Sequence, residues 1–316
     1  MLSSLAASGA KVSEIHAMNQ LYPIVLFVYK RFAVTHRVIE ALKENPEAPS
    51  SELIIFSDAP KTTFDSPKVE ELRRFLRTIK GFRTIQLRFR DENLGLARSF
   101  ISGISEILQV YEAAIILEDD NLVSKSFLSY MNESITYYKG NPRVSCVTGY
   151  SYPLIPKMRG AYFLRGAETW SIGVWRESWT GVEWDEKKLI QQLKELKSYS
   201  RFSFGGFGIP ELLELQRNGS VDSWGVRWWA SSYVRSLHCL YPPEPLCVSI
   251  GYGDDSVHCS GDWNPLYLRP NQLAHDYAFS PAPKSVKQRW TTTIRCLLMN
   301  LFTLPLYTRV QNRFAK

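Results

Sequence analysis

The sequence predicts an α/β fold in which a mostly parallel β-sheet is flanked by helices on both faces. Short apolar runs rich in β-branched residues recur through residues 23–148, and stretches with helical spacing of apolar residues separate them. Strands that alternate with helices form parallel sheets, because each crossover helix returns the chain to the same end of the sheet. The 316 residues, 45% of them hydrophobic, also exclude a disordered, collagenous or coiled-coil chain.

The expected strands share apolar character and a length typical of buried strands. They are residues 23–28, 52–56, 84–89, 113–117 and 143–148. The expected helices cover about 33–43, 66–79, 97–110 and 126–138. Ser66 is predicted to cap the second of these helices, because Pro67 suits the first helical position, and Gly81 is predicted to end it.

The strict alternation ends after Gly149, where Trp, Gly and Pro become frequent. Two further helices are expected, at 185–198 and 220–237. Because no Gly/Ser-rich linker interrupts the chain, residues 21–270 are predicted to form one domain with halves at 21–150 and 151–270. Residues 1–20 are expected to be a loose arm.

The charge is concentrated at the C-terminal end. The formal net charge is +7, and residues 284–316 hold seven basic residues and no acidic one, so the remainder is neutral. A neutral body argues against nucleic-acid binding. Ile294, Leu297, Leu298 and Leu301 keep helical spacing beside basic residues, which predicts an amphipathic helical tail at 271–316 that meets an anionic membrane surface. Docking of this tail on the core or in an oligomer is the alternative.

The cysteines favour a reducing compartment. There are five, an odd number, and none forms a C-x-x-C pair, so a disulfide framework is not expected. His238, Cys239, Cys247, His258 and Cys259 fit no common zinc spacing. The N-terminus lacks the features of a signal peptide, and no apolar run reaches the roughly 20 residues of a membrane span. The predicted location is the cytoplasm, peripheral on the inner face of the membrane where the tail binds it.

Three consecutive acidic residues follow the expected strand at 113–117. Glu118, Asp119 and Asp120 would repel one another at a strand end unless a cation or hydrogen-bond donors offset them. Mg²⁺ and Mn²⁺ prefer oxygen ligands and often combine one or two carboxylates with substrate phosphates. The alternative is a solvated acidic turn that caps the next helix.

Other segments that follow strands add to this pattern. They are Phe27-Val-Tyr-Lys-Arg31, Ser57-Asp58 and Arg90-Asp-Glu-Asn-Leu-Gly-Leu-Ala97. Together with the acidic triplet, their order resembles the nucleotide-binding half of GT-A glycosyltransferases, which carry a D-x-D motif or its E-D-D form. Within these, it resembles bacterial family 2-like and N-acetylglucosaminyltransferase I-like enzymes, and the resemblance covers residues 22–260, most firmly up to 150.

The resemblance implies roles for these residues. Asp120 would bind Mn²⁺ or Mg²⁺, and Glu118 and Asp119 would lie at the donor, a nucleotide-diphosphate sugar such as a UDP-sugar. Asp58 would accept a hydrogen bond from the uracil N–H. The remaining residues implied at the nucleotide are Tyr29, Arg31, Arg90 and Asn93.

The second half offers the acceptor side and the catalytic base. The stretch Glu168–Trp175 and the following Trp179 resemble the Trp-rich stretch of these enzymes, with rings that would stack on sugars or belong to the core. Inverting transfer needs a carboxylate that takes the acceptor proton. Asp222 is the first candidate, and Glu168, Asp254 and Asp255 are the alternatives.

Two more residues of this half have candidate roles. Arg227 would face the diphosphate or form a structural ion pair. His258 would complete the metal site.

The predicted function is therefore metal-dependent, inverting transfer of a sugar to a hydroxyl acceptor in the synthesis of cell-surface polysaccharide or glycoconjugates. A non-catalytic nucleotide-sugar or carbohydrate-binding module on the same fold is one alternative. A sugar nucleotidyltransferase is the other, although residues 28–33 lack the glycine-rich loop that such enzymes usually carry after the first strand.

Overall fold

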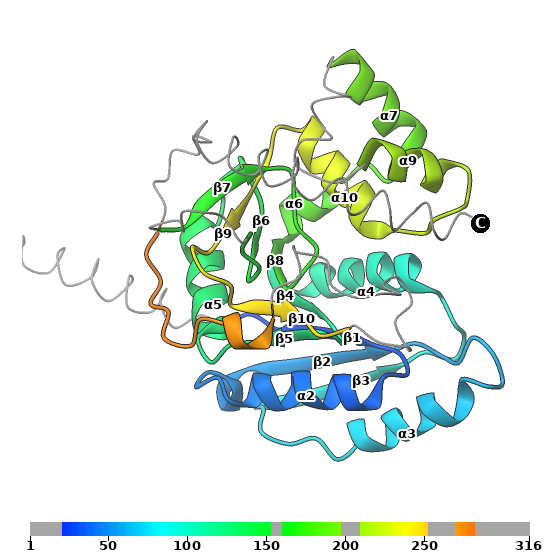
Figure 1. Cartoon of the computed structure of the whole chain (residues 1–316), viewed down its shortest axis with the longest axis vertical. Helices are drawn as coiled ribbons and strands as arrows, with labels where there is room; N and C mark the ends of the chain where they lie inside the picture. The colour runs from blue at the N-terminus through cyan, green and yellow to red at the C-terminus, as the bar shows by residue number, and fades with distance from the viewer. Residues whose placement is uncertain (1–20, 153–159, 197–208, 252–268, 282–316) are drawn as a thin grey trace, which may run out of the picture.

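A computed structural model describes residues 21–152, 160–196, 209–251 and 269–281 (Figure 1). Its centre is an eight-stranded sheet in the order β3-β2-β1-β4-β8-β6-β9-β7, in which β7 and β8 run opposite to the other strands. The strands are β1 (Ile24–Val28), β2 (Glu52–Ser57), β3 (Thr84–Phe89), β4 (Ala113–Glu118), β6 (Val144–Thr148), β7 (Tyr162–Arg165), β8 (Ile172–Trp175) and β9 (His238–Tyr241). A small antiparallel pair joins β5 (Asn121–Val123) to β10 (Cys247–Ser249).

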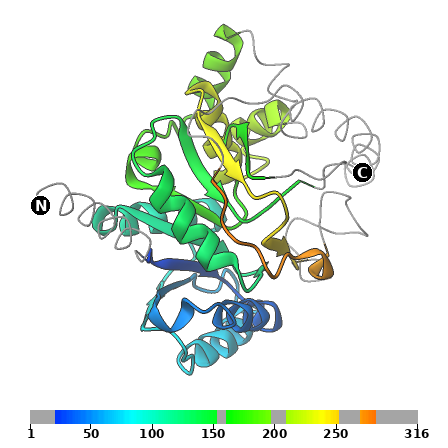
Figure 2. The same cartoon turned by 90° about the vertical axis from the view of Figure 1, so that its left-hand side faces the viewer.

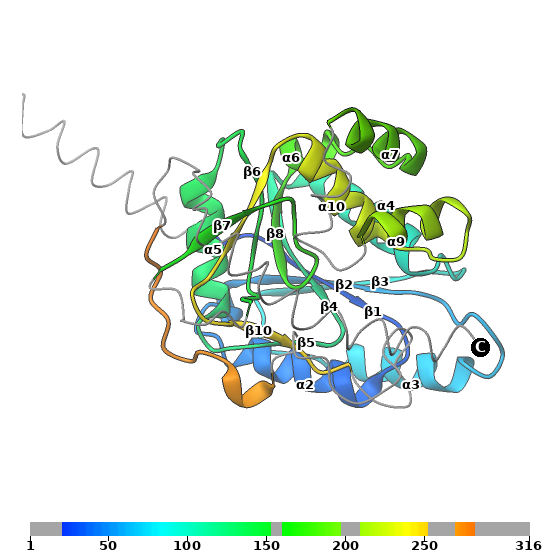
Figure 3. The same cartoon turned by 45° about the horizontal axis from the view of Figure 1, so that its top comes forward.

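Helices cover both faces of this sheet (Figures 1 and 3). One face packs against α2 (Phe32–Lys43), α3 (Ser66–Leu76) and α5 (Phe127–Tyr138), and Figure 2 brings α5 to the front. The other face packs against α4 (Leu96–Val110), α6 (Arg176–Thr180), α7 (Glu186–Glu195), α9 (Ile209–Arg217) and α10 (Trp224–Val234). Two short 3₁₀ turns are η1 (Ala48–Ser50) and η2 (Pro270–Gln272).

The alternation of side chains along each strand explains why both faces need cover. In β1, Val25 and Phe27 pack with the α4 side, whereas Ile24, Leu26 and Val28 pack with the α2 side. All five side chains are buried, because successive residues of a strand point to opposite faces. A strand that is apolar throughout therefore has to lie between two layers of helices. This arrangement confirms the predicted mixed α/β fold.

Several predicted helix boundaries differ from the structure. Asp65 is the N-cap of α3, so Ser66 and Pro67 are its first residues, and the helix ends at Leu76 rather than near Gly81. The Thr78 N–H bonds to the Phe75 carbonyl, which tightens the chain into a turn before Gly81 reaches its positive φ of 102°.

In the second half, Asp185 is the N-cap of α7, and its carboxylate accepts hydrogen bonds from the N–H groups of Lys187 and Lys188. The helix expected from residue 220 begins only at Trp224, because the hydroxyl of Ser223 accepts from the Val226 N–H and caps it there.

Strands from beyond residue 160 belong to the same sheet as the first four. β8 pairs with β4 and β6, and β9 joins β6 to β7. β7, β8 and β9 have four residues each, too few for periodicity to predict. Some predicted features lie outside the described residues. They are the arm at 1–20, residues 254 and 255, His258 and the basic segment 284–316.

The tryptophans that were candidates for an acceptor groove are mostly part of the core. Trp175 and Trp179 are 5% and 3% exposed, and Trp228 of α10, which was not one of these candidates, is fully buried. Their indole N–H groups donate to the Ile135 carbonyl, the Ser105 hydroxyl and the Glu168 carbonyl, respectively. Because each N–H has a protein partner, these rings can be buried without cost.

Cys146, Cys239 and Cys247 are buried free thiols. Within the described ranges, no cluster of three or more His, Cys, Asp or Glu side chains is arranged to hold a metal ion. No helix in the described part of the chain is long and apolar enough to cross a bilayer.

Candidate active site

The acidic triplet lies where the direction of the strand order reverses. From β1 the chain passes to β2 and β3 on one side, and it then crosses to β4 on the other side. Phe27 pairs with Glu118 across β1 and β4, so the carboxyl ends of the two strands meet at the same edge. Ligands of open α/β sheets bind at such switch points, because loops diverge there and leave the strand ends accessible.

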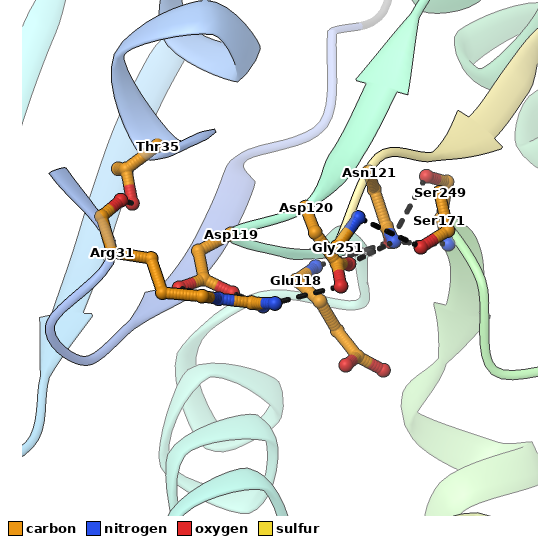
Figure 4. Close-up of polar contacts among 9 residues, drawn as sticks. All are labelled: Arg31, Thr35, Glu118, Asp119, Asp120, Asn121, Ser171, Ser249 and Gly251. Atoms are coloured by element: carbon orange, nitrogen blue, oxygen red, sulfur yellow. Dashed lines mark hydrogen bonds and ion pairs between the residues drawn. The ribbon is translucent and has the colours of Figure 1, made fainter. Parts of the chain in front are cut away.

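Arg31 neutralises two of the three acids (Figure 4). Its Nε donates to Asp119 Oδ2 at 3.2 Å, and its Nη2 donates to Asp119 Oδ1 and, at 3.1 Å, to Asp120 Oδ2. Burial opposes the charge on Arg31, but the hydrogen bonds and charges of Asp119 and then Asp120 raise its pKa above the usual value. Arg31 is therefore the cation that holds the turn after β4 together.

Glu118 stands apart from this ion pair. In Figure 4 its side chain points away from Arg31, and no described residue donates a hydrogen bond to its carboxylate. Burial raises the pKa of this carboxyl to about 8, and the charges of Asp120 and Asp119 add to the effect. A carboxyl with this environment is poised to bind a proton or a cation.

A second carboxyl, that of the half-buried Glu168, comes from the segment between β7 and β8. Its Oε1 accepts from the Thr169 N–H at 2.8 Å, and its Oε2 accepts from the Tyr241 hydroxyl at 3.3 Å. Burial raises the pKa of Glu168, and its charge contributes to the raised pKa of Glu118. Two acids from opposite halves of the chain therefore act on one another at this edge of the sheet.

Asn121 holds the triplet in place, although its amino-acid type alone gave no reason to single it out. Its side chain is fully buried, and its Oδ1 accepts from the N–H of Glu118 at 3.2 Å and from both the N–H and the hydroxyl of Ser171. Its Nδ2 donates to Asp120 Oδ1 at 3.0 Å. Ser171 adopts a positive φ of 48°, which is rare for a residue other than glycine. Asn121 thus ties the acidic turn to the start of β8.

Replacement of Asn121 by Ala is expected to destabilise the fold, because three donors would lose a buried acceptor. Each buried group left unpaired costs about 1–3 kcal/mol of unfolding free energy. Urea unfolding followed by circular dichroism measures the loss. Asn141→Ala is the matched control, since Asn141 Oδ1 accepts from the Arg143 N–H at an exposed site. Equal stability of the two variants would contradict the role of Asn121.

Gly251 closes over the ion pair from the end of β10. The Ile250 N–H donates to the Asp120 carbonyl at 2.9 Å, which brings residue 251 against the acidic turn. A Cβ at this position would overlap Asp120 Oδ2 and lie 2.7 Å from Arg31 Nη1. Glycine is therefore needed here for close approach of the backbone.

Asp58 and Asn93 join the loops that follow β2 and β3. The Asp58 carboxylate accepts from the N–H groups of Leu94, Gly95 and Ala59, at 3.0 to 3.2 Å. Asn93 Nδ2 donates to the Ala59 carbonyl at 2.6 Å. Both residues thus shape the segment that the family resemblance assigns to the nucleotide, and a base N–H would meet a carboxylate that already has three donors.

Tyr29 and Arg90 are also engaged with neighbouring loops. The Tyr29 hydroxyl accepts from the Lys61 N–H at 2.8 Å and donates to Asp65 at 3.1 Å. The Arg90 guanidinium lies over the Phe56 ring and donates to α4 at the Ser102 hydroxyl. Their roles at a nucleotide stay predictions.

Asp222 lies at the surface of the molecule. Its side chain is 60% exposed, and it accepts from Arg227 Nη2 at 3.4 Å, which is the structural ion pair considered for Arg227. Among the described residues, no hydrogen bond or ion pair joins Asp222 to Glu118, Asp119 or Asp120. Of the candidate bases that are described, Glu168 is the one brought to the acidic edge.

Replacement of Glu118 by Gln is expected to raise stability at high pH and leave it unchanged at low pH. The wild-type carboxyl titrates near 4.5 when unfolded and near 8 when folded, so folding favours its protonated form. Its stabilising effect is complete below the unfolded pKa and is lost as pH rises through about 8.

The melting temperatures of the two proteins in EDTA should therefore coincide at about pH 4 and separate by a few degrees at about pH 9, with the variant higher. A difference that is constant with pH would contradict the burial of this charge.

The sequence matches no protein-family model, and no curated protein matches it. Solved structures that share part of its fold include a mannosyltransferase, PcManGT, from Pyrobaculum calidifontis in complex with GDP-Man and Mn²⁺. The two share 11% identity over 57% of this chain and 48% of that one, with a TM-score of 0.34. Residues 1–349 of S. aureus TarS share 9% identity with it over 70% of this chain and 58% of that one, with a TM-score of 0.36. The bifunctional glycosyltransferase WbbM shares 8% identity over 42% of this chain and 23% of that one, with a TM-score of 0.27.

The matched region therefore spans about half or less of the length of most of these chains. The similarity is to glycosyltransferases and is partial, so the chemistry of the site has to be inferred from its own side chains.

Proposed function

We propose that this chain is a metal-dependent, inverting glycosyltransferase of the hexosyltransferase type. It would move a sugar from a nucleotide-diphosphate donor, a UDP-sugar in the first place, to a hydroxyl acceptor. The observation that carries the proposal is the meeting of two sets of acids at the switch point, Glu118-Asp119-Asp120 after β4 and Glu168 before β8. A single site can thereby bind a phosphate-bound cation and also supply a base.

The residues fit a divalent cation in their donor chemistry. Asp120 and Glu118 offer carboxylate oxygens, and the half-buried Glu118 has no hydrogen-bond donor among the described residues. Mg²⁺ and Mn²⁺ are held by one or two carboxylates when substrate phosphates supply other ligands. Such a cation would offset the negative charge that grows on the diphosphate leaving group. His258 is a further proposed ligand.

Glu168 is the proposed base that takes the proton of the acceptor hydroxyl. A general base works best when its pKa lies near the operating pH, and burial raises the pKa of Glu168 in that direction. The Thr169 N–H and the Tyr241 hydroxyl hold one carboxylate oxygen each and so orient the group. The exposed Asp222 lacks such an environment.

A panel of nucleotide sugars with Mn²⁺ or Mg²⁺ tests the proposal. A ligand that binds the folded state raises the melting temperature, and hydrolysis or transfer shows catalysis. We expect both effects with at least one donor and a requirement for the cation. Binding without turnover would favour a carbohydrate-binding module, and formation of a nucleotide sugar from a sugar phosphate would favour a nucleotidyltransferase.

A further inference from the structure

Both carboxylate oxygens of Asp120 already have donors. Asn121 Nδ2 lies 3.0 Å from Oδ1, and Arg31 Nη2 lies 3.1 Å from Oδ2 (Figure 4). Asn121 is fixed by its own buried hydrogen bonds to Ser171 and Glu118. The donor that can move aside for a cation is therefore the Arg31 guanidinium, which holds Oδ2, because Asn121 is fixed at Oδ1.

The ion pair is enclosed, which strengthens this competition. The side chains of Arg31, Asp119 and Asp120 are 18%, 9% and 15% exposed, and the backbone of Gly251 lies against both Arg31 and Asp120. Charges that are shielded from water act on one another more strongly than charges at the surface. A divalent cation on Asp120 would thus be repelled by the guanidinium that stays beside it.

Arg31 has a way to leave Asp120 without losing its place. It donates two hydrogen bonds to Asp119, through Nε and Nη2, but a single one to Asp120, through Nη2. A guanidinium binds phosphate as well as carboxylate, because its planar donors match both groups. An anionic diphosphate at the switch point can therefore draw Nη2 from Asp120 while Asp119 retains the rest of the side chain.

We infer that Arg31 competes with the divalent cation for Asp120 and yields this oxygen when a nucleotide diphosphate binds. This inference rests on the proposed function, because it takes Asp120 as the metal ligand. Its consequence is that the cation and the nucleotide bind cooperatively, each tightening the other by the same factor. Arg31 is then the residue that keeps the cation from binding tightly before the donor arrives.

Mn²⁺ binding to the full chain tests the inference without turnover. Free Mn²⁺ is measured by electron paramagnetic resonance for the wild type, Arg31→Gln and Arg31→Lys, with and without UDP. Without UDP, we expect Arg31→Gln to bind Mn²⁺ at least tenfold more tightly than the wild type. UDP should tighten Mn²⁺ binding less in this variant than in the wild type. Arg31→Lys keeps the positive charge but not the planar set of donors. Its affinity for Mn²⁺ should therefore lie between those of the wild type and Arg31→Gln.

Arg88→Gln is the matched control, because Arg88 pairs with Glu106 on the exposed surface and its loss should leave Mn²⁺ affinity unchanged. Equal or weaker Mn²⁺ binding by Arg31→Gln than by the wild type would overturn the inference, as would the absence of binding by both at millimolar Mn²⁺. Where Arg31→Gln does not fold, weaker binding by Arg31→Lys than by the wild type overturns it. Tighter binding by Arg31→Gln in a protein that transfers no sugar would refute the proposed function and leave the competition intact.

Discussion

Replacement of Glu168 by Gln is expected to lower sugar transfer by roughly 10²–10⁴-fold, the usual contribution of a general base. Gln keeps the size and an oxygen that can accept from the Thr169 N–H, but it cannot take a proton. The loss should fall on kcat, with donor affinity little changed, because the base acts on the acceptor hydroxyl in the transition state. Steady-state kinetics with the donor found in the nucleotide-sugar panel measure it.

Asp222→Asn is the matched comparison for this variant. Asp222 is 60% exposed and pairs with Arg227, so its replacement should change transfer only a few-fold. The reverse order, with a large loss for Asp222→Asn and a small one for Glu168→Gln, would return the role of base to Asp222. Such a result would mean that Asp222, just before α10, lies close to the acidic triplet when substrates are bound.

Replacement of Asp120 by Asn is expected to lower cation-dependent turnover on the order of 10³-fold, because the loss of charge stabilisation in a transition state has effects of this size. Asn keeps one oxygen that can accept from Arg31 or from Asn121, so the turn after β4 should remain folded. Turnover at saturating Mn²⁺ gives the effect on catalysis, and the melting temperature reports on the fold.

Asp276→Asn serves as the control, since Asp276 is an exposed residue in the segment after η2. It should leave both turnover and melting temperature unchanged. Full activity of Asp120→Asn, or wild-type activity that EDTA does not reduce, would remove the cation from the mechanism. The acids of the triplet would then bind the donor without a cation, or they would only stabilise the fold.

The strands and helices of the first half were predictable because their signals are local. A run such as residues 23–28 is apolar on both faces, and that property is sufficient to indicate a strand buried between two layers. The acidic triplet was equally visible, since its three members are adjacent in the chain and follow such a strand. The short strands β7, β8 and β9 gave too few residues for any period to be recognised.

The sequence by itself therefore determined the α/β class, the five strands expected up to residue 148 with their helices, and the acidic turn as the place to look for chemistry. Only the tertiary structure decided which residues share that place. Ser171 reaches Asn121 across 50 residues, and Gly251 lies against Arg31, a residue from the opposite end of the described chain. The same packing places the half-buried Glu168 near Glu118 and leaves Asp222 at the surface. The physical reason is that secondary structure follows from neighbouring side chains, whereas contacts between distant segments depend on how whole strands pair and which faces they bury.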